Sequence, residues 1–291
     1  PRQAYSRDGG RTCTEPAIAT YSPGGRLLKT PRACPALWRT AEGKYLFWFH
    51  HNSFPKTGGA ARNVAWLTGG IERDGFIHWS QPEPVCYQPD RRRGASYPDL
   101  IEWQGKYFIS STNKQEARII EIAPALLAGL WTQSARREVA RQGLALDLAS
   151  PKLRSETAPL PRLPALTADQ GGFAIELWLR LADLRAGQIL LDSRAQSRGP
   201  GIVVSTTDFA ALKLELTDGR NRTSWVCDPG LLTPERRHQI VFNVDIAPRL
   251  ISVVVDGVLC DGGDHAQYGY TRYGDVGLKP TGKEVGDVNG G

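Results

Sequence analysis

Apolar and polar residues alternate with a period of two along much of this chain, as they do in β-strands that bury one face. The alternation places Arg62, Val64 and Trp66 on one face of a predicted strand. The stretch 43–52 is instead continuously apolar and aromatic between turn residues, which predicts a buried strand. Helical periodicity is nearly absent, and only 117–131 offers a short helical stretch after a strand. The pattern predicts an all-β protein.

Two turns with similar chemistry separate the strands of residues 1–131. In Ser6–Thr14, Asp8 is followed by adjacent glycines, which suits a hairpin whose carboxylate bonds back to nearby amides. Ile71–Trp79 repeats the Asp-Gly bend, with Trp79 placed to pack beneath it. Strand, turn and aromatic recurring at this scale favour the blades of a β-propeller over a parallel α/β sheet. Because so few repeats cannot close a ring, we expect a partial propeller whose N-terminal part is missing from this sequence.

A different β domain is predicted in the second half of the chain. Residues 132–168 are rich in Ser, Ala, Pro and Arg, which predicts a linker. From 169 to 291, short β-branched stretches alternate with Asp-Gly and Gly-Pro turns, and the first stretch, 171–181, alternates strictly. This pattern is typical of an antiparallel sandwich or jelly roll. The sequence ends before a further strand is visible, so we allow for a truncated sandwich.

Composition and charge exclude several classes of protein. With 41% hydrophobic and 23% charged residues the chain is an ordinary globular one, and no apolar run is long enough to cross a bilayer. The formal charge is +6, and the small basic clusters at 91–93 and 236–237 lack the aromatic or glycine-rich motifs of nucleic-acid sites. We therefore predict neither nucleic-acid binding nor a membrane span. The chain starts at Pro1 and has no methionine, so we expect it to be a fragment.

Cysteine spacing gives little support to a metal site. The five cysteines show no CxxC spacing, which argues against zinc. Cys227 and Cys260 lie in the same predicted domain and can pair. An odd number leaves at least one thiol unpaired, so the count alone does not decide the redox compartment.

Several motifs resemble those of the sialidase family. Ser6–Cys13 resembles the Asp-box of sialidases, S-x-D-x-G-x-T-W, with Cys13 where the tryptophan is expected. Gly69–Trp79 resembles a degenerate second copy that keeps the aspartate, glycine and tryptophan. The order of arginine, strand, Asp-box-like turn and Tyr-x-x-Leu is similar to the C-terminal half of the sialidase propeller. The resemblance implies a propeller fold, because Asp-boxes in that family lie at blade turns away from the active site.

The resemblance also implies a site. Arg62 matches the last arginine of the family's carboxylate-binding triad, and Tyr97 matches its tyrosine nucleophile, while Arg32 is assigned as a further ligand arginine by position alone. A planar guanidinium can grip the carboxylate of a sialic acid, and a neutral phenol attacks the adjacent anomeric carbon with less repulsion than a carboxylate. Where related sequences have a glutamate on the following strand, this chain has Ser110 and Ser111.

Structural interpretations of the same residues stay open at this point. Arg62 is equally consistent with an exposed strand arginine, and Tyr97 with a packed or edge tyrosine, unless an arginine lies within its reach. His50 and His51 follow an aromatic strand, where a loop or packing role is commoner than metal binding.

The second domain resembles the laminin-G-like or concanavalin-A-like jelly rolls that are often appended to glycan-active enzymes. Many such domains bind sugars and some bind calcium, so a structural calcium ion is the one cofactor that the resemblance allows; none is expected for catalysis. Loop ends supply the candidate calcium ligands Asp192, Asp208 and Asp264, although surface turn aspartates are the commoner reading.

Together these resemblances predict a glycan-active protein with a glycan or glycoconjugate as its partner. The first hypothesis is a sialidase-like exo-glycosidase that retains anomeric configuration, located outside the cell, in the periplasm or at the cell surface. The alternative is a non-catalytic glycan-binding or adhesion protein whose propeller has degenerated. A third is action on another acid-bearing substrate, because fold does not fix function.

Overall fold

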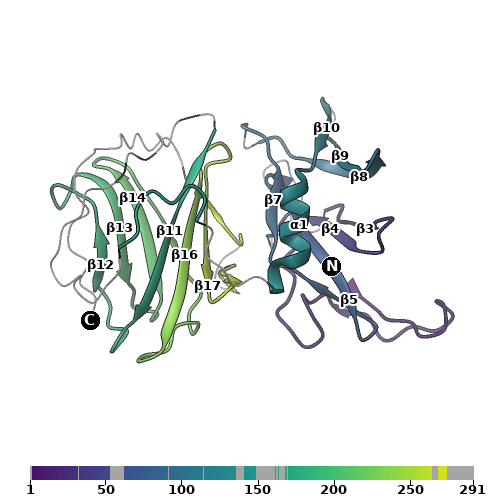
Figure 1. Ribbon diagram of the computed structural model, residues 1–291, viewed down its shortest axis with the longest axis horizontal. Helices are drawn as coiled ribbons and strands as arrows, with labels where there is room; N and C mark the ends of the chain where they lie inside the picture. Colours follow the sequence, from purple (N-terminus) through teal and green to yellow (C-terminus); the bar gives the residue numbers. More distant parts are fainter. Residues whose placement is uncertain are drawn as a thin grey trace. The chain divides into compact units, whose positions relative to one another are not determined.

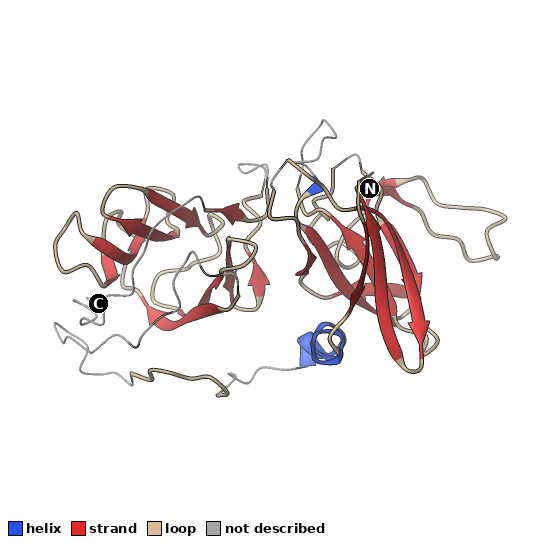
Figure 2. Cartoon of the chain, turned by 90° about the horizontal axis from the view of Figure 1, so that it is seen from above, coloured by secondary structure: helices blue, strands red, loops and turns tan. Residues whose placement is uncertain are grey.

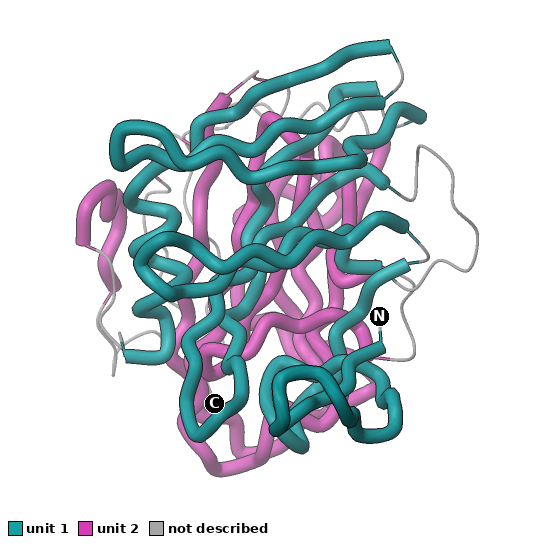
Figure 3. The backbone as a smooth tube through the Cα atoms, turned by 90° about the vertical axis from the view of Figure 1, so that its right-hand side faces the viewer, with its two compact units in different colours: residues 1–138 teal, residues 139–291 magenta. Residues whose placement is uncertain are grey.

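The computed structural model describes residues 2–31, 33–52, 62–90, 92–113, 115–135, 141–148, 161, 163, 168, 170–263 and 268–273. The chain divides into two compact units, unit 1 (residues 1–138) and unit 2 (residues 139–291), coloured separately in Figure 3. Strands form nearly all of the described regular structure (Figure 2), which confirms the all-β, antiparallel prediction. Within these described residues, no helix is long and apolar enough to span a membrane.

The first large sheet of unit 1 is an antiparallel meander (Figure 1). Its hairpin turn contains Asp74 and Gly75, both with positive φ (53° and 77°), as the Asp-Gly pair predicts. Trp79 packs near Phe47, with ring centroids 5.7 Å apart. The strands are β3 (Ala36–Arg39), β4 (Tyr45–Phe49), β5 (Ala65–Arg73) and β6 (Phe76–Trp79), with β7 (Glu83–Cys86) paired to the start of β5.

A second sheet of unit 1 packs against the first through a shared apolar core. It consists of β8 (Ser96–Trp103), β9 (Lys106–Thr112) and β10 (Ala117–Glu121). Leu46 and Trp48 of β4 share a buried cluster with Ile109 of β9. The neighbours Phe47 and Phe49 on β4 are also buried. The continuous apolar run at 43–52 is therefore a strand covered on both faces, as predicted.

Strand β5 begins later than the sequence pattern predicts. The alternation placed Arg62 within a strand, but the strand starts at Ala65. The Asn63 side chain is hydrogen-bonded to the backbone of Gln88, and the backbone pairing of β5 with β7 begins at Ala65. Arg62 therefore lies before the strand and is not one of its alternating residues.

Helix α1 (Pro124–Thr132) closes unit 1 against β5 and continues into the 3₁₀ turn η2 (Gln133–Ala135). Pro124 occupies the first turn, where its missing N–H costs no hydrogen bond. Trp131 donates from Nε1 to the backbone oxygen of Tyr45 at 3.0 Å. The helix lies so close to Gly69 of β5 that a Cβ there would stand 2.8 Å from Trp131 Cδ1.

We expect Gly69→Ala to destabilise the protein by about 1–3 kcal/mol, because the added methyl forces Trp131 and Leu130 away from β5. Gly129→Ala on α1 is the matched control, since a Cβ at Gly129 meets nothing within 4 Å. That control should stabilise the helix by about 0.5–1 kcal/mol. Urea unfolding of both variants checks the prediction, and equal effects on the two variants would contradict the close packing.

The N-terminal turn is organised by one carboxylate. Asp8 Oδ1 accepts the backbone N–H of Thr12 at 2.9 Å, and Asp8 Oδ2 accepts the Thr12 hydroxyl at 2.7 Å. The Ser6 hydroxyl also donates to Asp8. These bonds, those from Thr12 first, lower the pKa of Asp8 to about 2. The prediction that Asp8 bonds back to nearby amides is confirmed, and the flanking strands β1 (Arg2–Gln3) and β2 (Ala17–Ile18) pair with each other.

Unit 2 is a sandwich of two antiparallel sheets around one core (Figure 1). Phe173, Ile175, Leu177 and Leu179 all pack against that core, which confirms the alternation predicted for residues 171–181. One sheet contains β11 (Gly172–Arg180), β16 (Arg237–Asp245), β17 (Leu250–Val255), β18 (Val258–Leu259) and β19 (Thr271–Arg272). The other contains β12 (Ile189–Asp192), β13 (Pro200–Thr206), β14 (Leu212–Asp218) and β15 (Arg222–Val226).

The division between the units falls between Glu138 and Val139, inside the predicted linker 132–168. Most of that linker lies outside the described residues. The same holds for the end of the chain from residue 274 onwards.

Candidate functional site

Arg62 and Tyr97 lie side by side although they are far apart in the sequence. Ser96, the residue before Tyr97, is 34 positions after Arg62. The guanidinium carbon of Arg62 is 5.9 Å from the centroid of the Tyr97 ring, at the outer edge of cation–π range. Arg62 Nη1 donates to Ser96 Oγ at 3.0 Å, and the Ala95 N–H donates to the Arg62 backbone oxygen at 2.9 Å. We call Arg62, Ser96 and Tyr97 the Arg62–Tyr97 site.

An irregularity at the start of β8 turns the Tyr97 side chain outward. Ser96 pairs with Thr112, but the next paired residue is Asp99, opposite Ser110. The backbone of Tyr97 has a φ of +49°, a left-handed conformation that non-glycine residues adopt rarely. Bulges of this kind re-aim a side chain. As a result 55% of Tyr97 is exposed, next to a guanidinium.

The contacts of Arg62 hold its guanidinium in place without neutralising its charge. Its Nε is buried and has no hydrogen-bond partner among the described residues. Its Nη1 is held by Ser96, and no ion pair joins Arg62 to a carboxylate within the described part of the chain. A charged group that is oriented and not neutralised can receive an anion.

Ser110 and Ser111 are tied to the backbone of β8. Ser110 Oγ accepts the Asp99 N–H at 3.1 Å, and the Ser111 hydroxyl donates to the Ser96 oxygen at 3.3 Å. Ser110 and Ser111 occupy the positions at which the resemblance to sialidases predicts a glutamate. Both hydroxyls therefore fix the strand that carries Tyr97, and neither supplies a base.

The buried histidine His50 lies next to the site, and its neighbour in sequence, His51, is also buried. His50 is fully buried, and its Nε2 donates to the Ala95 oxygen at 2.8 Å, next to Ser96. Burial, opposed by that hydrogen bond and reinforced by the Arg62 charge, lowers the pKa of His50 to about 4. Burial, with the charges of Arg26 and Lys29, also lowers the pKa of His51 far below its ordinary value. Both imidazoles are neutral at pH 7, and His50 positions the segment that carries Ser96 and Tyr97.

We expect the free energy of unfolding to fall by roughly 3 kcal/mol as the pH drops from 6.5 to 4, through His50 alone. In that window the unfolded chain takes up a proton on His50 while the folded chain does not, so acid favours unfolding. His51 acts in the same direction. Urea titrations across this pH range measure the effect.

His50→Gln keeps an N–H donor but cannot take up the proton, so its stability should depend less steeply on pH. His78→Gln on β6 controls for the loss of a histidine elsewhere in unit 1. A wild-type protein of constant stability from pH 6.5 to 4, or a His50→Gln variant with the wild-type slope, would contradict the assignment.

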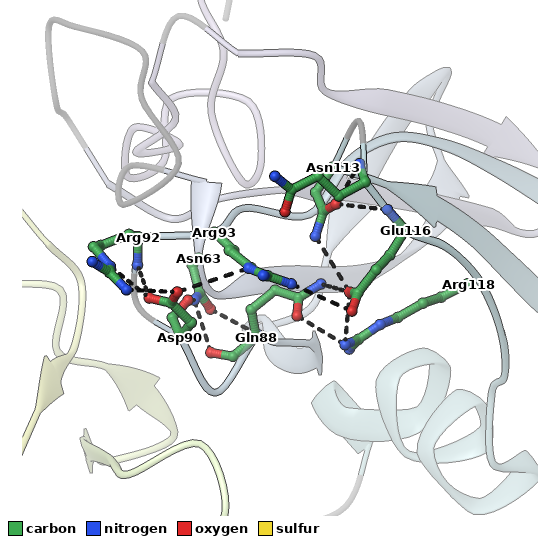
Figure 4. Close-up of polar contacts among 9 residues, drawn as sticks. Asn63, Gln88, Asp90, Arg92, Arg93, Asn113, Glu116 and Arg118 are labelled. Atoms are coloured by element: carbon green, nitrogen blue, oxygen red, sulfur yellow. Dashed lines mark hydrogen bonds and ion pairs between the residues drawn. The ribbon is translucent and has the colours of Figure 1, made fainter.

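A polar network begins at Asn63, the residue after Arg62, and includes Gln88, Glu116 and Arg118 (Figure 4). Asn63, directly after Arg62, accepts the Gln88 N–H at 3.1 Å and donates to the Gln88 oxygen at 2.9 Å. Arg118 Nη2 donates to Gln88 Oε1 at 2.8 Å and to Glu116 Oε2 at 3.1 Å. Arg93 reaches the same glutamate. Sequence reasoning missed this network; its only signal was Asn63 in an otherwise apolar stretch.

The other predicted ligands are one arginine and three aspartates, Arg32, Asp192, Asp208 and Asp264. Arg32 lies outside the described residues, as does Asp264. Asp192 is paired with Arg194, and Asp208 is exposed in the turn after β13. Among the described residues, no group of three or more His, Cys, Asp or Glu side chains is placed to hold a metal ion. The calcium expectation therefore stays untested.

No protein-family model and no curated protein matches this chain. The solved structures that are similar at a low level include the following two. The Ruminococcus gnavus IT-sialidase CBM40 has a TM-score of 0.27 and 12% identity, covering 46% of this chain and 88% of its own. A GH43 glycoside hydrolase engineered to display both endo-xylanase and exo-arabinofuranosidase activity has a TM-score of 0.21 and 10% identity, covering 90% of this chain and 68% of its own. At such scores neither likeness carries a functional argument.

Proposed function

We propose that unit 1 recognises an acidic sugar, of the sialic acid type, by holding its carboxylate at Arg62 beside the phenol of Tyr97. The observation that carries the proposal is the convergence of these two side chains, 5.9 Å from guanidinium carbon to ring centroid. Arg62 is positioned by Ser96 and lacks a carboxylate partner among the described residues. Tyr97 offers an exposed ring beside it.

The chemistry of the pair suits a carboxylated ring. A guanidinium presents parallel N–H donors that match the two oxygens of a carboxylate. An aromatic ring contacts the C–H face of a sugar while its hydroxyl bonds to polar groups. The left-handed backbone at Tyr97 sets the direction in which the side chain leaves the strand, toward solvent and beside Arg62.

A glycan array tests recognition directly. The full chain should bind sialosides and should not bind the corresponding asialo glycans at the same protein concentration. Equal signals from both sets, or signals from neutral glycans only, would sink the proposal. Tyr97→Ala should weaken the sialoside signal, and Tyr87→Ala, which removes a half-buried tyrosine outside the site, should leave it unchanged.

A second candidate is hydrolysis, with Tyr97 as the nucleophile. It is favoured by the exposed phenol, which stands next to the group that would hold the substrate carboxylate. In such a step a base takes the phenolic proton, the phenol oxygen bonds to the anomeric carbon, and the glycosidic bond breaks so that the aglycone leaves and takes up a proton. Water then cleaves the tyrosyl intermediate and releases the sugar. Among the described residues, no carboxylate is hydrogen-bonded to Tyr97. The geometry therefore supports a binding function more strongly than a catalytic one. Release of fluorophore from a 4-methylumbelliferyl sialoside separates the two candidates.

A further inference from the structure

Cys227 and Cys260 follow strands of opposite sheets in unit 2. Strand β15 ends at Val226 in one sheet, and β18 ends at Leu259 in the other. The two cysteines are 1% and 0% exposed and belong to the same buried cluster. Each cysteine therefore lies where the chain leaves a sheet and enters the core that the two sheets share.

The two thiols are in direct contact. They are free and hydrogen-bonded to each other, and the Leu212 N–H also donates to Cys227 Sγ at 3.0 Å. The bond from Cys260 lowers the pKa of Cys227, and the same bond raises that of Cys260. In the folded unit, Cys227 is thus the thiol that ionises more readily, and the sulfur next to it is that of Cys260.

The backbone holds this contact without help from the sulfurs. The side chain of Asp228, directly after Cys227, accepts the N–H of Asp261, directly after Cys260, at 3.1 Å and the N–H of Gly262 at 2.6 Å. Cys260 N–H bonds to the Val253 oxygen at 2.7 Å. Because the residues flanking both cysteines are clamped together, a bond between the sulfurs requires little backbone movement.

We propose that Cys227 and Cys260 form a disulfide that ties the two sheets of unit 2 together. The thiolate of one of the two cysteines attacks one sulfur of the disulfide of a thiol oxidoreductase, and the thiolate of the other then displaces that partner. The two cysteines lose two electrons and two protons, and the oxidoreductase leaves as a dithiol. Exchange takes place during folding, before the sheets close over the pair.

The bond would close a loop of about thirty residues between β15 and β18, restricting the unfolded chain. Oxidation should therefore raise the melting temperature of unit 2 by about 5–10 °C. The effect does not depend on the carbohydrate proposal for unit 1, since the two cysteines lie in unit 2.

The test refolds the full chain in a glutathione redox buffer and maps its peptides without reduction. We expect one linked pair, Cys227 with Cys260, and two fewer titratable thiols in the denatured protein than after reduction. The double variant Cys227→Ala/Cys260→Ala should lose the redox-dependent melting shift, and Cys86→Ala, a buried cysteine of unit 1, should keep it. Reduced peptides throughout, or links involving Cys13 or Cys34 instead, would overturn the proposal.

Discussion

Arg62→Ala is expected to weaken binding of a sialoside about 100-fold, because it removes a charge-assisted, two-pronged contact to the carboxylate. The Ser96 hydroxyl that holds Arg62 cannot replace that charge. Arg62→Lys should lose most of the affinity as well, since an ammonium keeps the charge but not the planar pair of donors. Isothermal titration with a methyl sialoside measures both variants.

Arg73→Ala is the matched control for the loss of an arginine. Arg73 ends β5, whereas Arg62 precedes its start, and Arg73 contacts Ser134 with no part in the site. Its affinity should stay at the wild-type value. Wild-type affinity in Arg62→Ala, with the variant as stable as the parent, would remove Arg62 from the binding site.

Tyr97→Phe is expected to abolish any sialoside hydrolysis, by at least about 1,000-fold, because the phenol oxygen is the atom that bonds to the anomeric carbon. Sialoside affinity should change little, since the ring and Arg62 remain. Initial rates with a 4-methylumbelliferyl sialoside, read beside titration with the methyl sialoside, separate the two effects.

The pattern of outcomes assigns the function. A wild-type protein that binds and releases fluorophore, with a Tyr97→Phe variant that only binds, supports hydrolysis. Binding without release by the wild type supports a recognition protein, consistent with Ser110 and Ser111 where a glutamate is expected. Hydrolysis by Tyr97→Phe at the wild-type rate would exclude Tyr97 as the nucleophile.

The sequence predicts the local structure well because local structure depends on neighbours. The alternation at 171–181 and the Asp-Gly turn at Asp74 each follow from short-range sterics and burial. Strand β5 is the exception. The prediction that Arg62 belongs to this strand is wrong because Asn63 bonds to Gln88, a contact between residues that are distant in sequence.

The candidate site is harder to predict for the same reason. Residue type and resemblance singled out Arg62 and Tyr97, but their proximity depends on the irregularity between Ser96 and Asp99 and on the link from Arg62 to Ser96. No spacing in the sequence encodes that irregularity. The sequence favours a loop or packing role for His50, yet its bond to the Ala95 oxygen connects it to the site, a role that the sequence does not reveal.

The most direct measurement compares two ligands on the wild-type protein by isothermal titration, a methyl sialoside and its carboxamide. They differ only at the group that Arg62 is proposed to hold. We expect the acid to bind about 100-fold more tightly than the amide, and the preference to disappear in Arg62→Ala. Equal affinity of the wild-type protein for acid and amide would contradict the proposed recognition of a carboxylate.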